Sequence, residues 1–134
     1  MSTASDRLSL EAIATEEAPA ALGPYAQAVR VGDFVYTSGQ VGIDPGSGQL
    51  VEGFEAQARQ VMRNLAHVLE AADASFADVV KATIYVVDLG RFALLNQIYA
   101  EALGGHRPAR STVEVAALPA GAEVEIDLVV HRPR

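Results

Sequence analysis

The sequence predicts a single α+β domain in which two helices cover one face of a β-sheet. Two amphipathic helix patterns are separated by a strand pattern, and further strand patterns precede and follow them. The 134 residues are enough to bury one core, and 50% of them are hydrophobic while 20% are charged. We interpret residues 1–12 as a polar lead-in and residues 13–134 as the domain.

The first half of the domain contains two strand patterns, a loop and a helix pattern. AQAVRVGDFVYTSG, residues 26–39, predicts two strands joined by a tight turn at Gly32-Asp33. GIDPGSGQL, residues 42–50, is rich in glycine, proline, aspartate and serine, which is typical of a loop. Apolar residues then recur every three or four positions between Gly53 and Ala72, which indicates an amphipathic helix.

The second half contains three strand patterns and one helix pattern. DVVKATIYVVD, residues 78–88, predicts a strand, because its apolar positions Val80, Ala82, Ile84 and Val86 alternate with Lys81, Thr83 and Tyr85. Asp88 can cap a second helix, which Gly104-Gly105 would end. The apolar stripe of this helix is Phe92, Leu95, Tyr99 and Leu103. RPARSTVEV, residues 107–115, and AEVEIDLVVH, residues 122–131, predict the last two strands. The predicted order is therefore strand, strand, helix, strand, helix, strand, strand.

One face of the predicted sheet is mixed in character. Arg110, Thr112 and Glu114 alternate with the serine and valines of the same strand, so we expect them to face away from the helices. The expected members of this face are Lys81, Thr83, Tyr85, Arg110, Thr112, Glu114 and Glu125. A face that is partly apolar and partly charged is typical of an oligomer interface that contains clefts.

Composition excludes several classes of function. The formal charge of −7 and the scattered basic residues do not favour nucleic-acid binding. The absence of cysteine excludes thiolate catalysis and cysteine-based zinc sites, and no two of the three histidines have the spacing of a metal-binding pair. No apolar run approaches the ~20 residues of a membrane span, and the N-terminus lacks a secretory pattern. We therefore expect no metal, no membrane partner and a cytoplasmic location.

Arg110 and Glu125 are the residues whose chemistry the pattern leaves open. An arginine at the start of a strand can hold a carboxylate through two parallel hydrogen bonds. It can equally form an ion pair with Glu114 or Glu125 that only neutralises an interface. Glu125 can be a solvated strand residue, or it can transfer a proton if it shares a cleft with Arg110.

Six segments, in order, resemble the Rid family, the RidA/YjgF-like enamine/imine deaminases. The likeness runs from about residue 14 to residue 132. The segments are APAALGPYAQAV (18–29), TSGQ (37–40), AQARQVMRNL (56–65), KATIYVVDL (81–89), RPARSTVEV (107–115) and VEID (124–127). Each segment alone is weak, but their joint order and spacing are specific.

The resemblance implies a fold, an assembly and an activity. The fold would be a mixed sheet like that of chorismate mutase from bacilli, with two helices on one face. Three copies would form a homotrimer with one active site in each cleft between neighbouring subunits. Each site would bind small 2-imino and 2-keto acids. The implied reaction is hydrolysis of 2-aminoacrylate, 2-iminopropanoate and 2-iminobutanoate to 2-keto acids and ammonia. It would need no cofactor and would protect pyridoxal-phosphate enzymes.

The same resemblance implies roles for particular residues. Arg110 would bind the substrate carboxylate, and Glu125 would orient or activate the attacking water. The other implied substrate-binding residues are Tyr25, Ser38, Gly39, Asn96 and Thr112. Thr112 stands where many relatives carry cysteine, so we expect no thiol-based regulation of this site.

Two rival functions come from other classes. The first is a non-catalytic trimer that binds small carboxylates or regulates partner proteins. The second is an endoribonuclease, which the acidic balance and the missing histidine pair do not favour.

Overall fold

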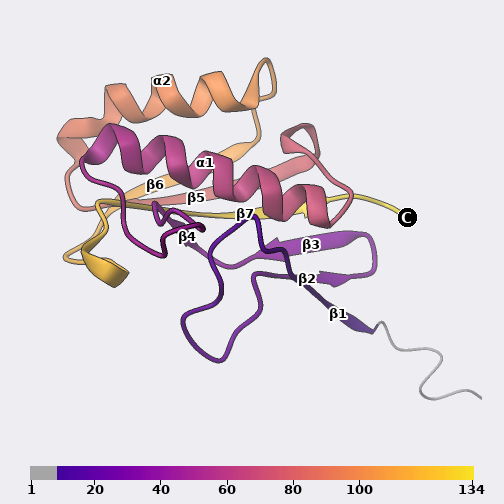
Figure 1. The fold of residues 1–134 in the computed structure, drawn as a ribbon. Coiled ribbons are helices and arrows are strands. Elements are labelled where there is room, and N and C mark those ends of the chain that lie inside the picture. The colour runs from indigo at the N-terminus through magenta and orange to yellow at the C-terminus, as the bar shows by residue number, and fades with distance from the viewer. Residues whose placement is uncertain (1–8) are drawn as a thin grey trace, which may run out of the picture.

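Two helices cover one face of a single β-sheet in the computed structural model, which describes residues 9–134 (Figure 1). The helices are α1 (Phe54–Ala71) and α2 (Phe92–Leu103). The strands are β1 (Leu10–Ile13), β2 (Ala28–Val31), β3 (Phe34–Thr37), β4 (Gln40–Val41), β5 (Val79–Val86), β6 (Ala109–Glu114) and β7 (Val124–His131). Short 3-10 turns lie at Phe76–Asp78, Leu89–Arg91 and Pro119–Gly121. Within residues 9–134, no helix is both long and apolar enough to span a bilayer.

The sheet has the strand order β1-β2-β3-β7-β5-β6, and β4 pairs with β7 beside the end of β3. All neighbouring strands are antiparallel except β5 and β6, which are parallel. A parallel pair needs a long crossover, and here α2 supplies it. The fold thus confirms the predicted mixed sheet with two helices on one face.

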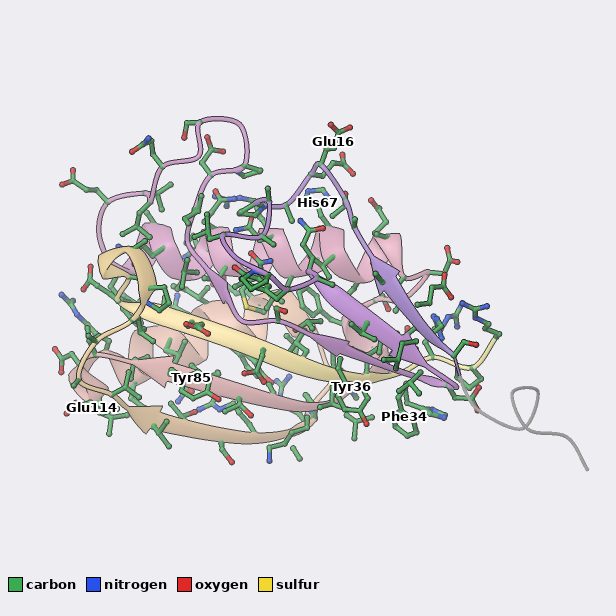
Figure 2. All side chains as sticks on the ribbon, turned by 90° about the horizontal axis from the view of Figure 1, so that it is seen from below. Glu16, Phe34, Tyr36, His67, Tyr85 and Glu114 are labelled. Carbon is green, nitrogen blue, oxygen red and sulfur yellow. The ribbon has the colours of Figure 1, made fainter. Side chains whose placement is uncertain are left out.

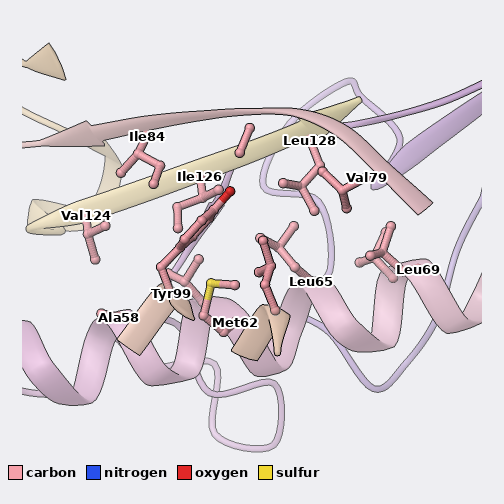
Figure 3. Close-up of a cluster of buried hydrophobic side chains, with 14 of the residues drawn as sticks. Ala58, Met62, Leu65, Leu69, Val79, Ile84, Tyr99, Val124, Ile126 and Leu128 are labelled. Atoms are coloured by element: carbon pink, nitrogen blue, oxygen red, sulfur yellow. The ribbon is translucent and has the colours of Figure 1, made fainter. Parts of the chain in front are cut away.

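The core lies between the helices and the sheet. Leu65 and Leu69 of α1 are fully buried and face the sheet, as Figure 3 shows. The opposing strand residues are Val79, Ile84, Val124, Ile126 and Leu128. Truncating a leucine such as Leu65 to alanine would cost about 2–5 kcal/mol of folding free energy, because it would leave a cavity.

Buried polar side chains on α1 hold β4 close to the helix. The Asn64 side-chain amide donates to the carbonyls of Val41 and Ile43 at 3.3 and 2.9 Å. Gly42 lies so close to α1 that a Cβ there would be 2.7 Å from the Cα of Gln57. These contacts fix the position of the chain just after Gly39, which belongs to the candidate site.

The sequence did not predict β1. Residues 10–12, assigned to the lead-in, form a strand with Ile13 that pairs antiparallel with β2, while residues 1–8 lie outside the described part of the chain. Leu10 is 74% exposed, and only Ile13 of this short edge strand is buried. Such a strand shows no alternation of buried and exposed residues for a pattern to reveal.

A β-bulge changes the predicted alternation at the start of β5. The register shifts between Val79 and Lys81, so that Val79 is buried and Val80 is 45% exposed. The predicted placement of Val80 with the core residues of this strand is therefore wrong. A bulge adds one residue to a strand, which reverses the faces on one side of it.

The expectation that Arg110, Thr112 and Glu114 face away from the helices is also wrong. These residues lie opposite Ala82, Ile84 and Val86 of β5, all of which are buried beneath the helices. Directly opposed residues on neighbouring strands point to the same face. The assumption that the valines of this strand face the helices fails because β6 is an edge strand. Its helix-facing positions are only partly covered and can therefore be polar.

The open face of the sheet carries the remaining members of the predicted mixed face. Tyr85 lies opposite both Glu125 of β7 and Val113 of β6. Figure 2 views this side of the sheet and labels Phe34, Tyr36 and Tyr85. The exposed fractions of Phe34, Tyr36 and Val113 are 39%, 48% and 43%. The open face is therefore mixed, as predicted, but its members differ.

Candidate active site

The predicted site residues form two separate groups in the structure. Asn96, Arg110 and Thr112 lie between α2 and β6, and we call this group the arginine half-site. Tyr25, Ser38, Gly39 and Glu125 lie around one hollow near the end of β3, and we call this group the glutamate half-site.

The side chain of Arg110 is held by three residues of α2. Its Nη2 donates to Oδ1 of Asn96 at 2.7 Å. Its guanidinium carbon lies 5.3 Å from the ring centroid of Phe92 and 5.0 Å from that of Tyr99. Phe92, Asn96 and Tyr99 are spaced by four and three positions, so they share one face of the helix. The arginine is thus oriented by an amide and two aromatic rings.

No carboxylate neutralises Arg110 within the chain from residue 9 onward. Neither of the ion pairs considered from the sequence forms, since no acidic oxygen lies within 4.0 Å of its guanidinium. Glu114 instead accepts a hydrogen bond from the backbone N–H of Leu89 at 2.9 Å. The positive charge of a partly buried, oriented arginine is therefore available to an external anion.

Two buried hydroxyls accompany this arginine. Tyr99 Oη and Thr112 Oγ1 have no hydrogen-bond partner among the described residues. Tyr99 is 7% exposed, and its hydroxyl end points toward the sheet (Figure 3). Burial raises the pKa of Tyr99, against the opposing charges of Arg110 and Arg107, so the hydroxyl stays neutral.

The glutamate half-site is a surface hollow of about 320 Å³. It is lined by Leu22, Tyr25, Ser38, Gly39, Val41, Pro119 and Glu125. The Tyr25 hydroxyl accepts from the backbone N–H of Leu22 at 3.0 Å, and the Ser38 hydroxyl donates to the carbonyl of Ala26 at 2.6 Å. These contacts fix both side chains on the rim of the hollow.

Gly39 makes room for the carboxylate of Glu125. A Cβ at position 39 would lie 2.0 Å from Oε2 of Glu125 and 2.7 Å from its carboxyl carbon. Any side chain at this position would therefore displace the carboxylate. The glycine and the glutamate form one structural unit, although 86 positions separate them in the sequence.

The electrostatic surroundings of Glu125 favour a protonatable carboxyl group. Burial raises the pKa of Glu125, and the neighbouring carboxylate of Asp127 raises it further. Burial also raises the pKa of Asp127, whereas Tyr85 and Lys81 lower it. A carboxyl whose pKa rises toward neutrality is suited to accept and return a proton.

The two half-sites of one chain face opposite sides of the sheet. Arg110 lies on the helix side, whereas Glu125 lies opposite Tyr85 on the open side. One chain therefore cannot present both side chains to the same small molecule.

Sequence reasoning missed the aromatic residues that contact Arg110. Phe92 and Tyr99 were assigned only to the apolar stripe of the second helix. Their spacing around Asn96 was a usable signal, because residues at positions i, i+4 and i+7 share a helix face. Leu22, Val41 and Pro119 of the glutamate half-site had no such signal, since the fold alone brings them together.

Comparison with known proteins places the chain in a family. Residues 15–132 match the family described as Endoribonuclease L-PSP. The 2-iminobutanoate/2-iminopropanoate deaminase of Mus musculus is 48% identical over 118 residues, which are 87% of each chain. The crystal structure of RidA from an Antarctic Psychrobacter superposes with a TM-score of 0.89 at 49% identity, covering 90% of this chain and 98% of that one. Escherichia coli TdcF with bound serine has a TM-score of 0.87 at 36% identity, with coverage of 91% and 98%. The chain therefore belongs to the Rid family of RidA/YjgF-like proteins.

Proposed function

We propose that this protein hydrolyses short 2-imino acids and their enamine tautomers to 2-keto acids and ammonia. The observation that carries the proposal is Arg110, an oriented arginine with no carboxylate partner in residues 9–134. Two findings on relatives support it. The mouse relative is named as a deaminase of such imines, and the TdcF structure holds serine, which carries a carboxylate.

The active site in this proposal is shared between two copies of the chain. The arginine half-site of one copy would hold the substrate carboxylate, and the glutamate half-site of the next would face the C=N carbon. The separation of the half-sites on opposite sheet faces supports this arrangement. The exposed apolar side chains of Phe34, Tyr36 and Val113 on the open face supply surface for the contact. A ring of three copies would contain three such sites.

The remaining predicted residues complete the cleft. Asn96 would hold the guanidinium of Arg110 in position, and Thr112 would line the same wall. Tyr25, Ser38 and Gly39 would form the opposite wall, where backbone N–H groups and hydroxyls can bind the polar atoms of the substrate.

The chemistry needs binding, orientation and proton transfer. The enamine, where present, first becomes the protonated imine by accepting a proton at C3. Water then attacks C2 of the protonated imine, its proton passes to the Glu125 carboxylate, and the C=N electron pair moves to nitrogen. Glu125 then gives this proton to the nitrogen, the C–N bond breaks and ammonia leaves, while the hydroxyl proton passes back to the Glu125 carboxylate as the C=O bond forms. Fixing the carboxylate on Arg110 reduces the entropic cost of the attack, and no cofactor enters the scheme.

The proposal extends to the role of the reaction in the cell. Enamines and imines of this kind are reactive and attack pyridoxal-phosphate enzymes, so their hydrolysis would protect those enzymes. We propose the cytoplasm as the compartment, because pyridoxal-phosphate dehydratases that release such intermediates operate there.

The direct test couples a threonine or serine dehydratase to the protein and follows the appearance of keto acid. We expect the wild type to accelerate keto-acid release and Arg110→Ala to lose about 30-fold to 4,000-fold, since removing one partner of a buried charge pair costs about 2–5 kcal/mol. Arg107→Ala is the matched control, because this exposed arginine contacts only backbone carbonyls at Gly104 and His106. Equal rates for Arg110→Ala and the wild type would refute the proposal.

A further inference from the structure

A second cluster of chemically active side chains lies away from both half-sites. His67 of α1 lies between Glu17, in the loop after β1, and Glu70, one turn further along α1. The ligand atoms of these three side chains all lie within 4.8 Å of one another. Figure 2 shows His67 beside the loop that carries Glu16, the neighbour of Glu17.

The distances within this cluster fit a common ion better than direct hydrogen bonds. His67 Nδ1 is 3.7 Å from Oε2 of Glu17 and 3.8 Å from Oε1 of Glu70. Hydrogen bonds between such groups are 2.7–3.2 Å long. Two ligands bound at about 2.1 Å to one tetrahedral zinc ion lie about 3.4 Å apart. Small rotations of the exposed glutamates would therefore bring all three atoms into coordination.

The backbone that carries these ligands is fixed before any ion binds. His67 and Glu70 lie on the same face of an 18-residue helix. Glu17 lies between Thr15 and Ala18, whose backbone carbonyls accept hydrogen bonds from the buried side chain of Gln27 at 3.0 and 3.3 Å. The Glu17 backbone N–H also donates to the Thr15 hydroxyl at 3.1 Å. Only the side-chain torsions remain to be ordered on binding.

The charges of the cluster are not otherwise compensated. Within residues 9–134, no Lys or Arg forms an ion pair with Glu17 or Glu70, and His67 is their only basic neighbour within 4.0 Å. Arg63, one turn before His67, donates instead to Oε1 of Gln60 at 2.8 Å. The two glutamate side chains therefore have no arginine or lysine partner among residues 9–134 that would compete with a divalent cation.

We propose that Glu17, His67 and Glu70 bind one divalent transition-metal ion of the zinc class, with water completing the coordination. An imidazole ligand favours Zn²⁺ over Mg²⁺ or Ca²⁺, which prefer oxygen ligands. The ion would tie the loop that continues to Tyr25 onto α1. The sequence-based expectation of no metal rested on missing cysteines and histidine pairs, whereas the cluster proposed here joins His67 to a glutamate 50 positions away.

The test is metal titration of the full-length protein after dialysis against a chelator. Isothermal titration with ZnCl₂ should give one site per chain, and MgCl₂ should give none. Glu17→Gln, His67→Ala and Glu70→Gln should each weaken zinc binding at least about tenfold. Glu52→Gln, an exposed glutamate in the loop before α1, is the matched control and should bind zinc like the wild type.

A thermal readout keeps the test independent of enzyme activity. Zinc should raise the Tm of the wild type and of Glu52→Gln but not that of Glu17→Gln or His67→Ala, since a ligand stabilises the state that binds it. Circular dichroism would establish that the variants are folded. If the substitutions in α1 unfold the protein, Glu17→Gln, which lies outside the helix, still tests the site. Equal zinc affinity in all variants, or equal binding of Mg²⁺, would overturn the proposal.

Discussion

The two half-sites differ in how the fold holds their functional groups. In the arginine half-site, three side chains of α2 hold the guanidinium of the β6 residue Arg110, with an amide at 2.7 Å and rings at 5.0 and 5.3 Å. In the glutamate half-site, loops and a strand surround a hollow of about 320 Å³, and the carboxylate lies against a glycine. The first is a firmly held guanidinium with no acidic partner among the described residues, and the second is an open hollow beside a carboxyl group whose pKa burial raises.

This difference shows why one chain is an incomplete catalyst under the proposed function. The arginine half-site can bind a carboxylate but has no proton acceptor within the described chain, since Glu114 is occupied by the backbone of Leu89. The glutamate half-site has a proton acceptor but no arginine or lysine in its lining. Each half supplies what the other lacks, so their separation is informative about assembly.

The largest expected effect comes from mixing two inactive variants. Arg110→Ala and Glu125→Ala should each lose nearly all deaminase activity. When the two are unfolded together and reassembled in equal amounts, activity should return to about a quarter of the wild-type level. The reason is that each half is intact in half of the copies, and a shared site needs both. The measurement is keto-acid release per chain in the dehydratase-coupled assay.

The same mixture can contradict the shared site. If both half-sites acted within one chain, no mixture of the two variants would contain an intact site. Mixed samples that stay as inactive as the separate variants, while wild-type chains treated in the same way recover, would exclude sites between copies.

Gly39→Ala should give the next largest effect by moving the Glu125 carboxylate. The added Cβ would meet Oε2 of Glu125 at 2.0 Å, so the carboxylate must shift by an ångström or more. Such a displacement of a catalytic group costs about 10²-fold in kcat. The backbone at Gly39 is not in the left-handed region, so the fold should persist. Steady-state kinetics measures the expected loss in kcat, and circular dichroism checks that the fold persists.

Gly46→Ala is the control for this substitution. Its Cβ would meet only the Asp44 carboxylate at 3.6 Å, an ordinary contact. Full activity of Gly39→Ala would mean that the position of the Glu125 carboxylate does not matter for turnover.

The sequence predicted the helices and most strands because their patterns are periodic. The predicted helix over residues 53–72 corresponds to Phe54–Ala71, and Asp88 caps the turn before α2 through the backbone N–H of Gly90. The short edge strand β1 and the bulge in β5 have no periodic signature, and both were missed.

The residues of the candidate site came from the family resemblance, but their arrangement in space did not follow from the sequence. Alternation shows that Arg110 and Val113 occupy opposite faces of a strand, but not which face the helices cover. That choice depends on the parallel pairing of β6 with β5 and on the position of α2, which are properties of the whole fold. The roles of the residues remain predictions that rest on family resemblance.

A smaller effect is expected from the aromatic support of Arg110. Phe92→Leu removes one ring from the guanidinium, and a cation–π contact at a partly exposed position contributes about 0.5–1 kcal/mol. We therefore expect KM to rise about twofold to fivefold while kcat changes less. Tyr99→Phe is the comparison, because it keeps the ring and removes only the unpartnered hydroxyl. It should leave KM unchanged, and a large rise in its KM would show that the hydroxyl contacts the substrate.

The smallest effect is the change in stability caused by Glu125→Gln. This substitution should stabilise the fold although it removes activity. Burial raises the pKa of Glu125 above its ordinary value of 4.5, so the folded state favours the protonated carboxyl. The stability that this group contributes is present below pH 4.5 and is lost as pH rises through the folded-state pKa. Glu125→Gln should therefore raise the Tm modestly at pH 7 and leave it nearly unchanged at pH 4, while abolishing turnover.

Thermal melts of Glu125→Gln across this pH range separate a functional group from a structural one. Glu52→Gln, at an exposed position, should change the Tm equally little at both pH values. A Tm of Glu125→Gln below that of the wild type at pH 7 would mean that the carboxylate stabilises the fold. Stabilisation together with loss of turnover would instead indicate that the fold tolerates a costly buried carboxyl because the reaction requires it.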